Sequence, residues 1–368
     1  MKVLITGSQG FIGQNLVERI NTLKGYEILE IDTHNNEEEL YDSILKSDII
    51  FHLAGVNRPQ NTEDFYKGNT QLTEKIVNIL RHLNKKVPII MSSSIQAELD
   101  NDYGKSKKAA EDIVLKFGLE NKSTVVIYRF PNVFGKWSRP NYNSAVATFC
   151  YNISRNKDIW ISDREKIINL VYIDDVLDEM ISNLKQEKVI RGYRKVKIEY
   201  KKTLGEIADL IMSFKNSRDN LLLPNVEDEF IKKLYSTYLS FLPEDNFKYE
   251  LKMNVDNRGS FTELLKSKDG GQFSVNISKP GITKGNHWHN TKVEKFIVVK
   301  GSALIKLRKV NSSKVIEYRV SDKKIEVVDI PSGYTHSIKN IGNEDMVTIM
   351  WANENFDEEK PDTIYLEV

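Results

Sequence analysis

The sequence predicts an α/β fold with a doubly wound parallel sheet, followed by a smaller all-β antiparallel barrel. From residue 2 to about residue 135, strand patterns alternate with helix patterns, which is typical of βαβ units and a parallel sheet. A glycine-rich turn directly follows the first strand. Beyond the stretch 243–249, short strands separated by glycine and proline replace the long helices. We therefore expect two domains, residues 1–243 and residues 244–368.

The composition is that of an ordinary globular protein. Lys and Arg number 53 against 52 Asp and Glu, and the net charge of +1 favours neither a nucleic-acid partner nor a membrane surface. No apolar run reaches membrane-spanning length, and the chain starts directly in a strand, so no signal peptide is expected. The single cysteine, Cys150, cannot form an internal disulfide and is expected to be a small buried hydrophobe. These features predict a cytoplasmic protein.

The first element is a strand at residues 2–5 that runs into three glycines, each three residues after the last. This spacing lets the backbone turn tightly and approach a pyrophosphate, while the N-terminus of the following helix faces the negative charge. A plain turn is the alternative. The small residues that end the strand at 48–55 would let a second loop lie against the same cofactor. The predicted cofactor contacts are Gly7, Gly10, Phe11, Ile12, Gly13, Leu53, Ala54 and Gly55.

The strand at residues 27–31 ends at Asp32. An acidic residue there often binds the ribose 2′-hydroxyl and favours NAD, and no arginine follows to hold a 2′-phosphate. Asp32 could equally be a solvated turn residue. A helix is expected to start at the acidic run 37–39, and a longer one at residues 63–83. We expect His34 and His82 to be exposed, His52 to be a satisfied structural histidine and Asn69 to hydrogen-bond nearby backbone.

A fourth strand at residues 87–91 leads into three serines at 92–94 and then into a helix that carries Tyr103 and Lys107. The spacing of four places the phenol and the ammonium on one helical face. The lysine is expected to lower the tyrosine pKa, so that the phenol can exchange a proton with a hydroxyl or carbonyl. One serine hydroxyl can reach the same oxygen. Chance pairs at this spacing are common on solvated helices, and the serines could be ordinary turn residues.

The remaining elements of the first domain have weaker patterns. The sequence predicts a strand at 124–128, a strand and helix start at 171–176, a solvated strand at 194–202, an N-capped helix starting at 203–207 and a buried aromatic segment at 234–242.

A second group of polar residues lies in the all-β part. His287 and His289 are two apart, so on a strand they face the same side. Glu294 and His336, brought in from neighbouring strands, would complete a shell of three nitrogens and one oxygen. Such a shell suits zinc or another first-row divalent ion. Structural imidazoles without a metal are the alternative.

The first 240 or so residues resemble the extended short-chain dehydrogenase/reductase family that acts on nucleotide sugars, a Rossmann-like fold. The matching features are the glycine turn, the serine cluster, residues 103–107 and residues 129–135. The resemblance implies Ser93, Tyr103 and Lys107 as catalytic residues, with Tyr103 and Lys107 also contacting the cofactor, and Ser94 and Asn132 at the substrate. A 4,6-dehydratase in this family carries Asp-Glu after the serine or threonine. Ile95 after Ser94 argues against that reaction.

Residues 281–340 match both motifs of the cupin jelly-roll family, except that Ile325 stands where a glycine is expected. The segment 256–263 resembles the substrate-binding motif of deoxysugar 3,5-epimerases, which implies that Arg258, Phe261 and Glu263 bind substrate. In those epimerases the histidine at the position of His287 is the base. If His287 holds a metal, another residue must abstract the proton.

The whole chain is similar to a family of capsular polysaccharide biosynthesis enzymes that join a reductase to a cupin. The resemblance implies a homodimer that epimerises C3 of a UDP-2-acetamido-2,6-dideoxy-4-ketohexose and reduces C4 with NADPH. The product would be UDP-2-acetamido-2,6-dideoxy-L-talose, a precursor of UDP-N-acetyl-L-fucosamine. The NADPH that the resemblance implies conflicts with Asp32, which favours NAD. NADH therefore stays open as the alternative cofactor. The alternative is a reductase whose cupin binds zinc without catalysis, for dimerisation or regulation.

Overall fold

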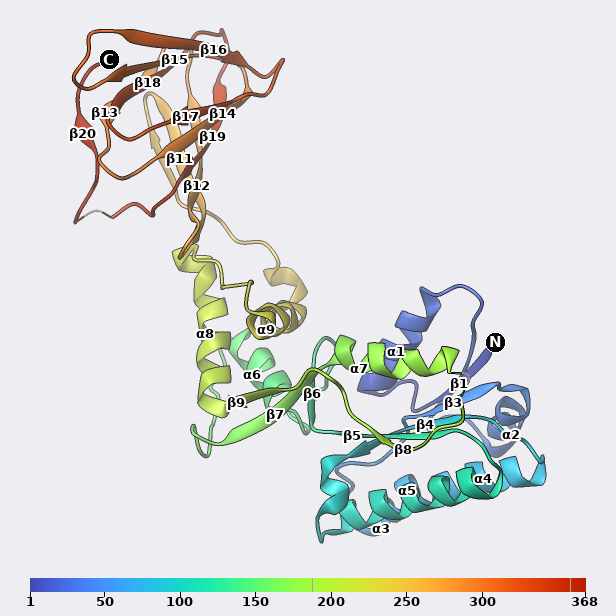
Figure 1. Cartoon of the computed structure of the whole chain (residues 1–368). Coiled ribbons are helices and arrows are strands. Elements are labelled where there is room, and N and C mark those ends of the chain that lie inside the picture. Colours follow the sequence, from blue (N-terminus) through green and yellow to red (C-terminus); the bar gives the residue numbers. More distant parts are fainter. Residues whose placement is uncertain (187, 358) are drawn as a thin grey trace. The chain divides into compact units, whose positions relative to one another are not determined.

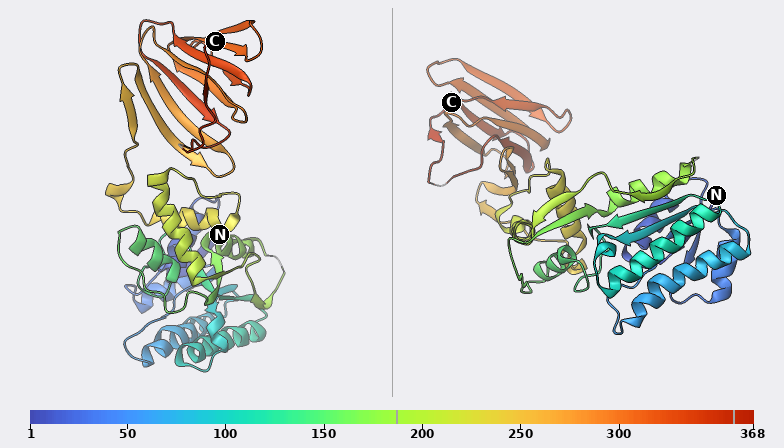
Figure 2. Two further views of the ribbon diagram at one scale, coloured as in Figure 1. Left: turned by 90° about the vertical axis from the view of Figure 1, so that its left-hand side faces the viewer. Right: turned by 60° about the horizontal axis from the view of Figure 1, so that its bottom comes forward.

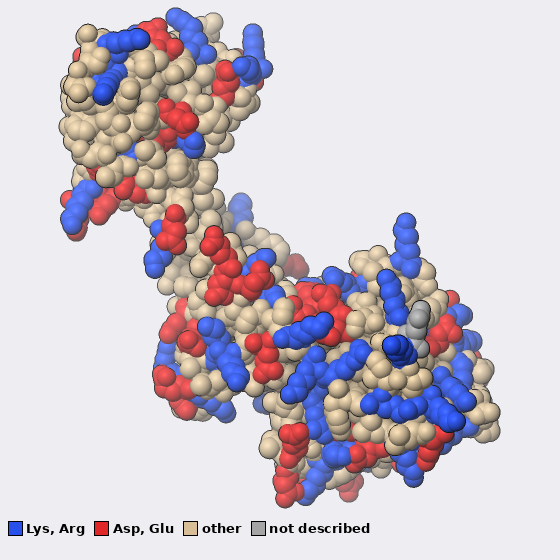
Figure 3. Space-filling view, in the orientation of Figure 1, with Lys and Arg blue, Asp and Glu red and all other residues tan. Residues whose placement is uncertain are grey.

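The structure is a computed structural model that describes residues 1–186, 188–357 and 359–368. The chain forms two compact units. The N-terminal unit comprises residues 1–212 and 233–243, and the C-terminal unit comprises residues 213–232 and 244–368. In the described residues, no helix is long and apolar enough to span a bilayer. Basic and acidic side chains mix on the face drawn in Figure 3, as expected from the net charge of +1.

The main sheet of the N-terminal unit has the strand order β2-β1-β3-β4-β5-β8, and every neighbouring pair is parallel. The order reverses between β1 and β3, and ligands bind at the carboxyl ends of strands around such a switch point. The predicted doubly wound, Rossmann-like sheet is confirmed (Figure 1). The strands are β1 Lys2–Thr6, β2 Glu27–Ile31, β3 Ile49–His52, β4 Ile89–Ser94, β5 Val125–Phe130 and β8 Arg191–Arg194.

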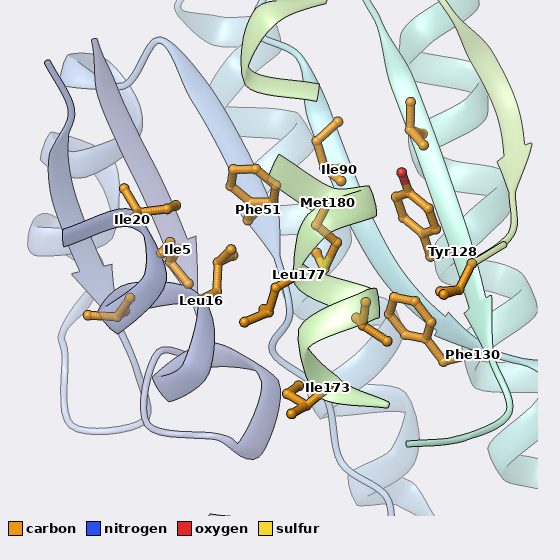
Figure 4. Packing of buried hydrophobic residues seen from close by; sticks show 14 of the residues in the cluster. Ile5, Leu16, Ile20, Phe51, Ile90, Tyr128, Phe130, Ile173, Leu177 and Met180 are labelled. Atoms are coloured by element: carbon orange, nitrogen blue, oxygen red, sulfur yellow. The ribbon is translucent and has the colours of Figure 1, made fainter. Parts of the chain in front are cut away.

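Helices cover both faces of this sheet. Helices α1 and α7 pack on one face, where Phe51 and Ile90 from the strands meet Leu16 and Leu177 (Figure 4). Helices α4 and α5 lie on the other face, around Phe117 (Figure 2, right). Each such buried side chain contributes about 1.5–3 kcal/mol. The helices are α1 Phe11–Asn21, α2 Glu37–Lys46, α3 Glu63–Phe65, α4 Leu72–His82, α5 Asp102–Glu120, α6 Ala145–Ile153, α7 Ile173–Ile181, α8 Leu204–Asn220 and α9 Glu229–Ser240.

Polar side chains fix the starts of these helices. Asn36 and Glu39 form a capping box at α2, as do Thr203 and Glu206 at α8, so both predicted helix starts are confirmed. Asn101 accepts a hydrogen bond from the Gly104 amide at 2.8 Å and so starts α5 two residues before Tyr103. The predicted helix 63–83 forms one uninterrupted helical segment from Glu63 to His82, but residues Tyr66–Gln71 within it are π-helical. This wider turn carries Asn69, whose side chain hydrogen-bonds the Val56 amide and carbonyl.

The predicted single strand at 194–202 is wrong. Arg194 ends β8, which pairs with β5, whereas β9 begins at Tyr200 in a separate sheet. The chain has to cross between two sheets there, and alternation of charge does not reveal that crossing. This second sheet has the order β6-β7-β9, with β6 Asn132–Phe134, β7 Ile167–Tyr172 and β9 Tyr200–Thr203.

The isolated polar residues are mostly where the sequence places them. His34 and His82 are exposed, and Cys150 is fully buried. His52 is buried between the hydroxyls of Thr6 at 2.7 Å and Thr73 at 2.8 Å. Burial lowers the pKa of His52 to about 3, so the imidazole is neutral, as expected of a structural histidine.

The described residues of the C-terminal unit contain two antiparallel sheets, with the orders β10-β11-β12-β19-β14-β17 and β16-β15-β18-β13-β20. Their inner faces share a core that includes Phe296, Ile305 and Ile338. The predicted all-β jelly-roll is confirmed (Figure 2, left). The strands are β10 Met253–Asp256, β11 Gly259–Ser267, β12 Gly271–Ser278, β13 Thr283–Trp288, β14 Glu294–Lys300, β15 Ser302–Lys309, β16 Val315–Ser321, β17 Val327–Ile330, β18 Tyr334–Asn340, β19 Met346–Ala352 and β20 Ile364–Tyr365.

Candidate active sites

The glycine turn between β1 and α1 forms the floor of a cavity of about 800 Å³. Gly7 has φ +73°, and a Cβ there would lie 2.7 Å from the Ala54 amide nitrogen, so only glycine lets the two loops approach this closely. Gly10 caps α1 without a side-chain hydrogen bond, and no acidic residue lies in the first turn. The exposed helix N-terminus is therefore suited to a pyrophosphate.

Most residues predicted to bind the cofactor or act in catalysis line this one cavity. Asp32 and Ala54 do not line it, although Ala54 forms the close contact with Gly7. The predicted residues that line it are Gly7, Gly10, Phe11, Ile12, Gly13, Leu53, Gly55, Ser93, Ser94, Tyr103, Lys107 and Asn132.

The carboxylate of Asp32 is used within the protein. It accepts hydrogen bonds from the backbone amides of Gln9 and Thr33, both at 2.8 Å. Asp32 thus ties the glycine turn to the end of β2. A contact of this carboxylate with a ribose stays a prediction.

The structure places Ser94, and not Ser93, beside Tyr103. The Ser94 side chain hydrogen-bonds the phenol. Ser93 is 6% exposed and donates to Glu111 Oε1 at 2.6 Å. Successive side chains of a strand point to opposite faces, so only one of two adjacent serines can reach the phenol. The Ser93 hydroxyl is engaged by Glu111, so its role as the partner of Tyr103 stays a prediction.

Burial controls the ionisation of the Tyr103 and Lys107 pair. Burial raises the pKa of Tyr103, and it does so more than the Ser94 hydrogen bond lowers it. The predicted lowering of this pKa by Lys107 is therefore wrong for the protein alone. Burial also lowers the pKa of Lys107 to about 8, against the opposing effect of the Glu111 carboxylate. Lys107 Nζ donates to the Ser92 carbonyl at 3.0 Å, which holds the ammonium at the cavity wall.

The far wall of the cavity includes residues that sequence reasoning missed. Trp137, Arg139 and Tyr142 line it together with the predicted Asn132. Trp137 has φ +67°, a left-handed conformation that is rare for a bulky residue and that concentrates at ligand sites. The Arg139 guanidinium lies 5.0 Å from the Tyr142 ring. An arginine and aromatic residues in a loop rich in asparagine and proline were the signal available in the sequence.

In the C-terminal unit, the four predicted metal ligands come together. His287 lies on β13 opposite His336 of β18, and His289 follows the end of β13. Glu294 Oε2 lies 3.1 Å from His336 Nε2 and 3.4 Å from His289 Nε2. The ligand atoms of all four residues lie within 4.8 Å of one another.

This cluster fits a divalent cation. Three of its buried polar atoms, His289 Nε2, Glu294 Oε2 and His336 Nδ1, have no hydrogen-bond partner within the structure. Burial and the two neighbouring histidines lower the pKa of His287 to about 4, which keeps its imidazole neutral. Neutral imidazoles and an ionised carboxylate are the states that bind zinc.

The cluster lies at the wall of a second cavity, of about 750 Å³. The predicted substrate residues Arg258 and Phe261 line this cavity, whereas Glu263 does not and instead forms an ion pair with Lys266 at 2.8 Å. A bulge between Glu263 and Leu265 makes β11 irregular at this point. The cavity also contains Lys284, which the sequence did not single out. Its Nζ donates to Asn276 Oδ1 at 2.7 Å and to the Ile277 carbonyl at 3.0 Å.

Two family models match the chain. The NAD dependent epimerase/dehydratase family matches residues 3–198, and the polysaccharide biosynthesis C-terminal domain matches residues 254–364. The first model covers the glycine turn and the Tyr103 region, and the second covers the histidine cluster. An NAD(P) cofactor follows from the first match.

Known proteins resemble the chain over its whole length. The UDP-2-acetamido-2,6-beta-L-arabino-hexul-4-ose reductase of Pseudomonas aeruginosa is 45% identical over 363 residues, which cover 99% of this chain and 98% of the relative. A crystal structure of the capsular polysaccharide assembling protein CapF from Staphylococcus aureus is 51% identical and covers both chains fully, with a TM-score of 0.93. The UDP-glucuronic acid 4-epimerase from Bacillus cereus, in complex with NAD, shares the fold of 60% of the chain at 18% identity and a TM-score of 0.53, and covers 83% of that relative.

The Lys107 pKa predicts how dinucleotide binding depends on pH. Below pH 8 the side chain is an ammonium that can donate to the cofactor, and above this value it loses a proton. We expect the Kd for NADPH to rise as the pH increases from 7 to 9.5, by up to about tenfold per pH unit above 8. Nicotinamide fluorescence measures this Kd. Tyr103 does not produce the change, because its pKa is raised above its ordinary value. A Kd that stays constant to pH 9.5 contradicts the prediction.

Proposed function

Because the chain belongs to the NAD dependent epimerase/dehydratase family, in the group that includes CapF, we propose that it is a bifunctional nucleotide-sugar enzyme. Residues 1–243 reduce a C4 ketone with NADPH, and residues 244–368 epimerise C3 of the same sugar. The observation that carries the proposal is the convergence of Tyr103, Ser94 and Lys107 on the cavity that the glycine turn opens. The substrate is a UDP-2-acetamido-2,6-dideoxy-4-ketohexose, as the name of the Pseudomonas aeruginosa relative suggests.

For the reduction, bound NADPH supplies a hydride to C4. Tyr103 donates its phenolic proton to the C4 oxygen, and the raised pKa keeps the phenol protonated for this step. Ser94 hydrogen-bonds the same oxygen as negative charge develops there. Lys107 holds the nicotinamide ribose. Asn132, Trp137 and Arg139 line the remaining cavity wall, where the nucleotide part of the sugar would bind.

For the epimerisation, the C4 ketone acidifies the proton at C3. A base removes this proton, and an acid returns one to the opposite face. A zinc ion on His287, His289, Glu294 and His336 would supply Lewis acidity toward the C4 oxygen. Because His287 is then a ligand, it cannot also act as the base. Arg258, Lys284 and Lys292 are cations that line this cavity, and they can hold the anionic substrate.

The product would be UDP-2-acetamido-2,6-dideoxy-L-talose, on the way to UDP-N-acetyl-L-fucosamine for capsular polysaccharide. We propose NADPH rather than NADH, because Asp32 is engaged by the amides of Gln9 and Thr33 and so has less capacity to select a ribose hydroxyl. A cytoplasmic homodimer is part of the same proposal.

A second candidate keeps the reductase but makes the cupin a metal-binding module for dimerisation or regulation. Glu263, which was predicted to bind substrate, does not line the cavity beside the proposed zinc ligands, and this favours the alternative. The presence of Arg258, Phe261 and Lys284 in the cavity beside the cluster favours catalysis.

The two adjacent serines test the reductase assignment. We expect Ser94→Ala to lower kcat for NADPH oxidation with the 4-keto sugar by about 10²–10³-fold, because it removes a hydrogen bond to the developing oxyanion. Tyr103→Phe removes the proton donor and should lower kcat by at least about 10²–10⁴-fold.

Ser93→Ala is the matched control for the serine test. It keeps the Ser94 hydroxyl and should retain a larger fraction of the wild-type kcat than Ser94→Ala does. A Ser93→Ala defect that exceeds the Ser94→Ala defect restores Ser93 as the partner and refutes the assignment. With wild-type enzyme, a higher kcat/KM for NADH than for NADPH contradicts the proposed cofactor.

Proton exchange at C3 separates the two candidate functions. The Tyr103→Phe protein leaves the ketone unreduced, so NMR in deuterium oxide can follow the C3 proton of the 4-keto sugar. We expect exchange faster than without protein, and loss of exchange when His289→Ala is added to Tyr103→Phe. Exchange no faster than the uncatalysed rate, with folded and zinc-loaded protein, supports the non-catalytic module instead.

A further inference from the structure

The last residues of the chain lie against the proposed metal site. We call residues 361–368 the C-terminal strap. Within it, β20 pairs with β13, the strand that carries His287, with the register His287↔Tyr365 and Trp288↔Ile364. The Leu366 amide donates to the Asn286 carbonyl at 3.0 Å. The strap is therefore bonded to the backbone on both sides of His287.

Asp362 in the strap binds the loop that connects two ligands. Its carboxylate accepts hydrogen bonds from the backbone amides of Asn290 at 2.9 Å, Thr291 at 2.7 Å and Lys292 at 3.0 Å. The Asn290 side chain donates to it as well, at 2.9 Å. These residues lie between His289 and Glu294. One carboxylate therefore fixes the short segment that sets the spacing of two ligands.

The backbone of Asp362 also determines the state of His289. The carbonyl of Asp362 accepts a hydrogen bond from His289 Nδ1. A carbonyl oxygen can only accept, so Nδ1 carries the proton and the lone pair is on Nε2. His289 Nε2 faces Glu294 Oε2 at 3.4 Å and has no hydrogen-bond partner in the structure. This is the tautomer that a metal requires if Nε2 is the ligand atom.

From these contacts we propose that Asp362 is a positioning residue for the divalent-cation site, and that the C-terminal strap is an integral part of that site. The inference rests on the proposed function of the histidine cluster. Asp362 acts through His289 and through the 290–292 loop, and it does not touch the cation. Partners that orient a ligating histidine typically affect metal affinity by about 10–100-fold.

The strap also contributes to the cavity beside the cluster. Thr363 lines this cavity, and its hydroxyl lies 3.4 Å from Lys292 Nζ, a second lining group. Docking of the strap thus shapes the ligand loop and the cavity wall together. Cation binding and strap docking are thermodynamically linked. If the docked strap increases the affinity for the cation, the bound cation stabilises the docked strap by the same free energy.

The test compares two carboxylates of the strap. Asp362→Asn in the full chain keeps the backbone carbonyl, the size of the side chain and one acceptor oxygen, but it replaces the other oxygen with an NH₂ group that cannot accept from the amides of the loop. Glu367→Gln is the matched control, because Glu367 accepts from the exposed Tyr365 hydroxyl at 3.1 Å and does not contact the ligand loop. Zinc affinity is measured by competition with a chromophoric chelator. Cobalt substitution reports the ligand geometry through its visible spectrum.

We expect Asp362→Asn to bind zinc about 10–100-fold more weakly and to change the cobalt spectrum, with Glu367→Gln unchanged. Equal zinc affinity and equal spectra for Asp362→Asn and wild type overturn the inference while leaving the metal site intact. A wild-type protein that binds neither ion refutes the metal site itself, and the inference with it.

Hydrogen exchange on the wild-type protein provides a second measurement that does not depend on the folding of a variant. Adding zinc should slow exchange in the peptides that contain residues 290–292 and 361–368. Zinc binding without added protection of the strap overturns the coupling.

Discussion

The buried carboxylate of Glu111 is the interaction on which the reductive site depends. It is fully buried and accepts hydrogen bonds from the Ser93 hydroxyl on β4, from Arg129 on β5 at 2.6 and 2.9 Å and from the Tyr193 hydroxyl on β8. Glu111 lies one turn after Lys107 on α5. One carboxylate therefore fixes the helix of Tyr103 and Lys107 against three strands. Removing one partner of such a buried pair typically costs about 3–5 kcal/mol.

In the C-terminal unit, the carboxylate of the histidine cluster is not paired with an arginine, unlike Glu111. Glu294 lies among three imidazoles, of which burial lowers the pKa of His287, and the cluster contains no arginine that could neutralise the carboxylate. Burial raises the pKa of Glu294, but the neighbouring His289 and His336 lower it by more, so the carboxylate is ionised. An ionised carboxylate beside neutral nitrogens attracts a cation. The buried carboxylate Glu111 is thus paired within the protein, whereas Glu294 is placed to pair with a bound cation.

Local patterns were sufficient to predict the parallel sheet, the glycine turn, the Tyr103–Lys107 pair and the histidine cluster, because each depends on spacing within one or two elements. Which of Ser93 and Ser94 faces Tyr103 could not be predicted, because the phase of a strand is not visible in three identical residues. The Tyr103 pKa was mispredicted because burial depends on the whole fold. The role of Asp362 could not be predicted, because Asp362 contacts a ligand loop that is about 70 residues away in sequence. Contacts between distant segments are what the sequence alone cannot reveal.

The most direct test of two chemistries on one sugar is a single product analysis. The 4-keto substrate, NADPH and the wild-type protein are combined in deuterium oxide, and the product is examined by NMR and mass spectrometry. The expected product carries deuterium at C3 with inverted configuration and protium from NADPH at C4, in the same molecule. A reduced product that retains its original C3 hydrogen and configuration would show that the chain reduces the sugar without epimerising it.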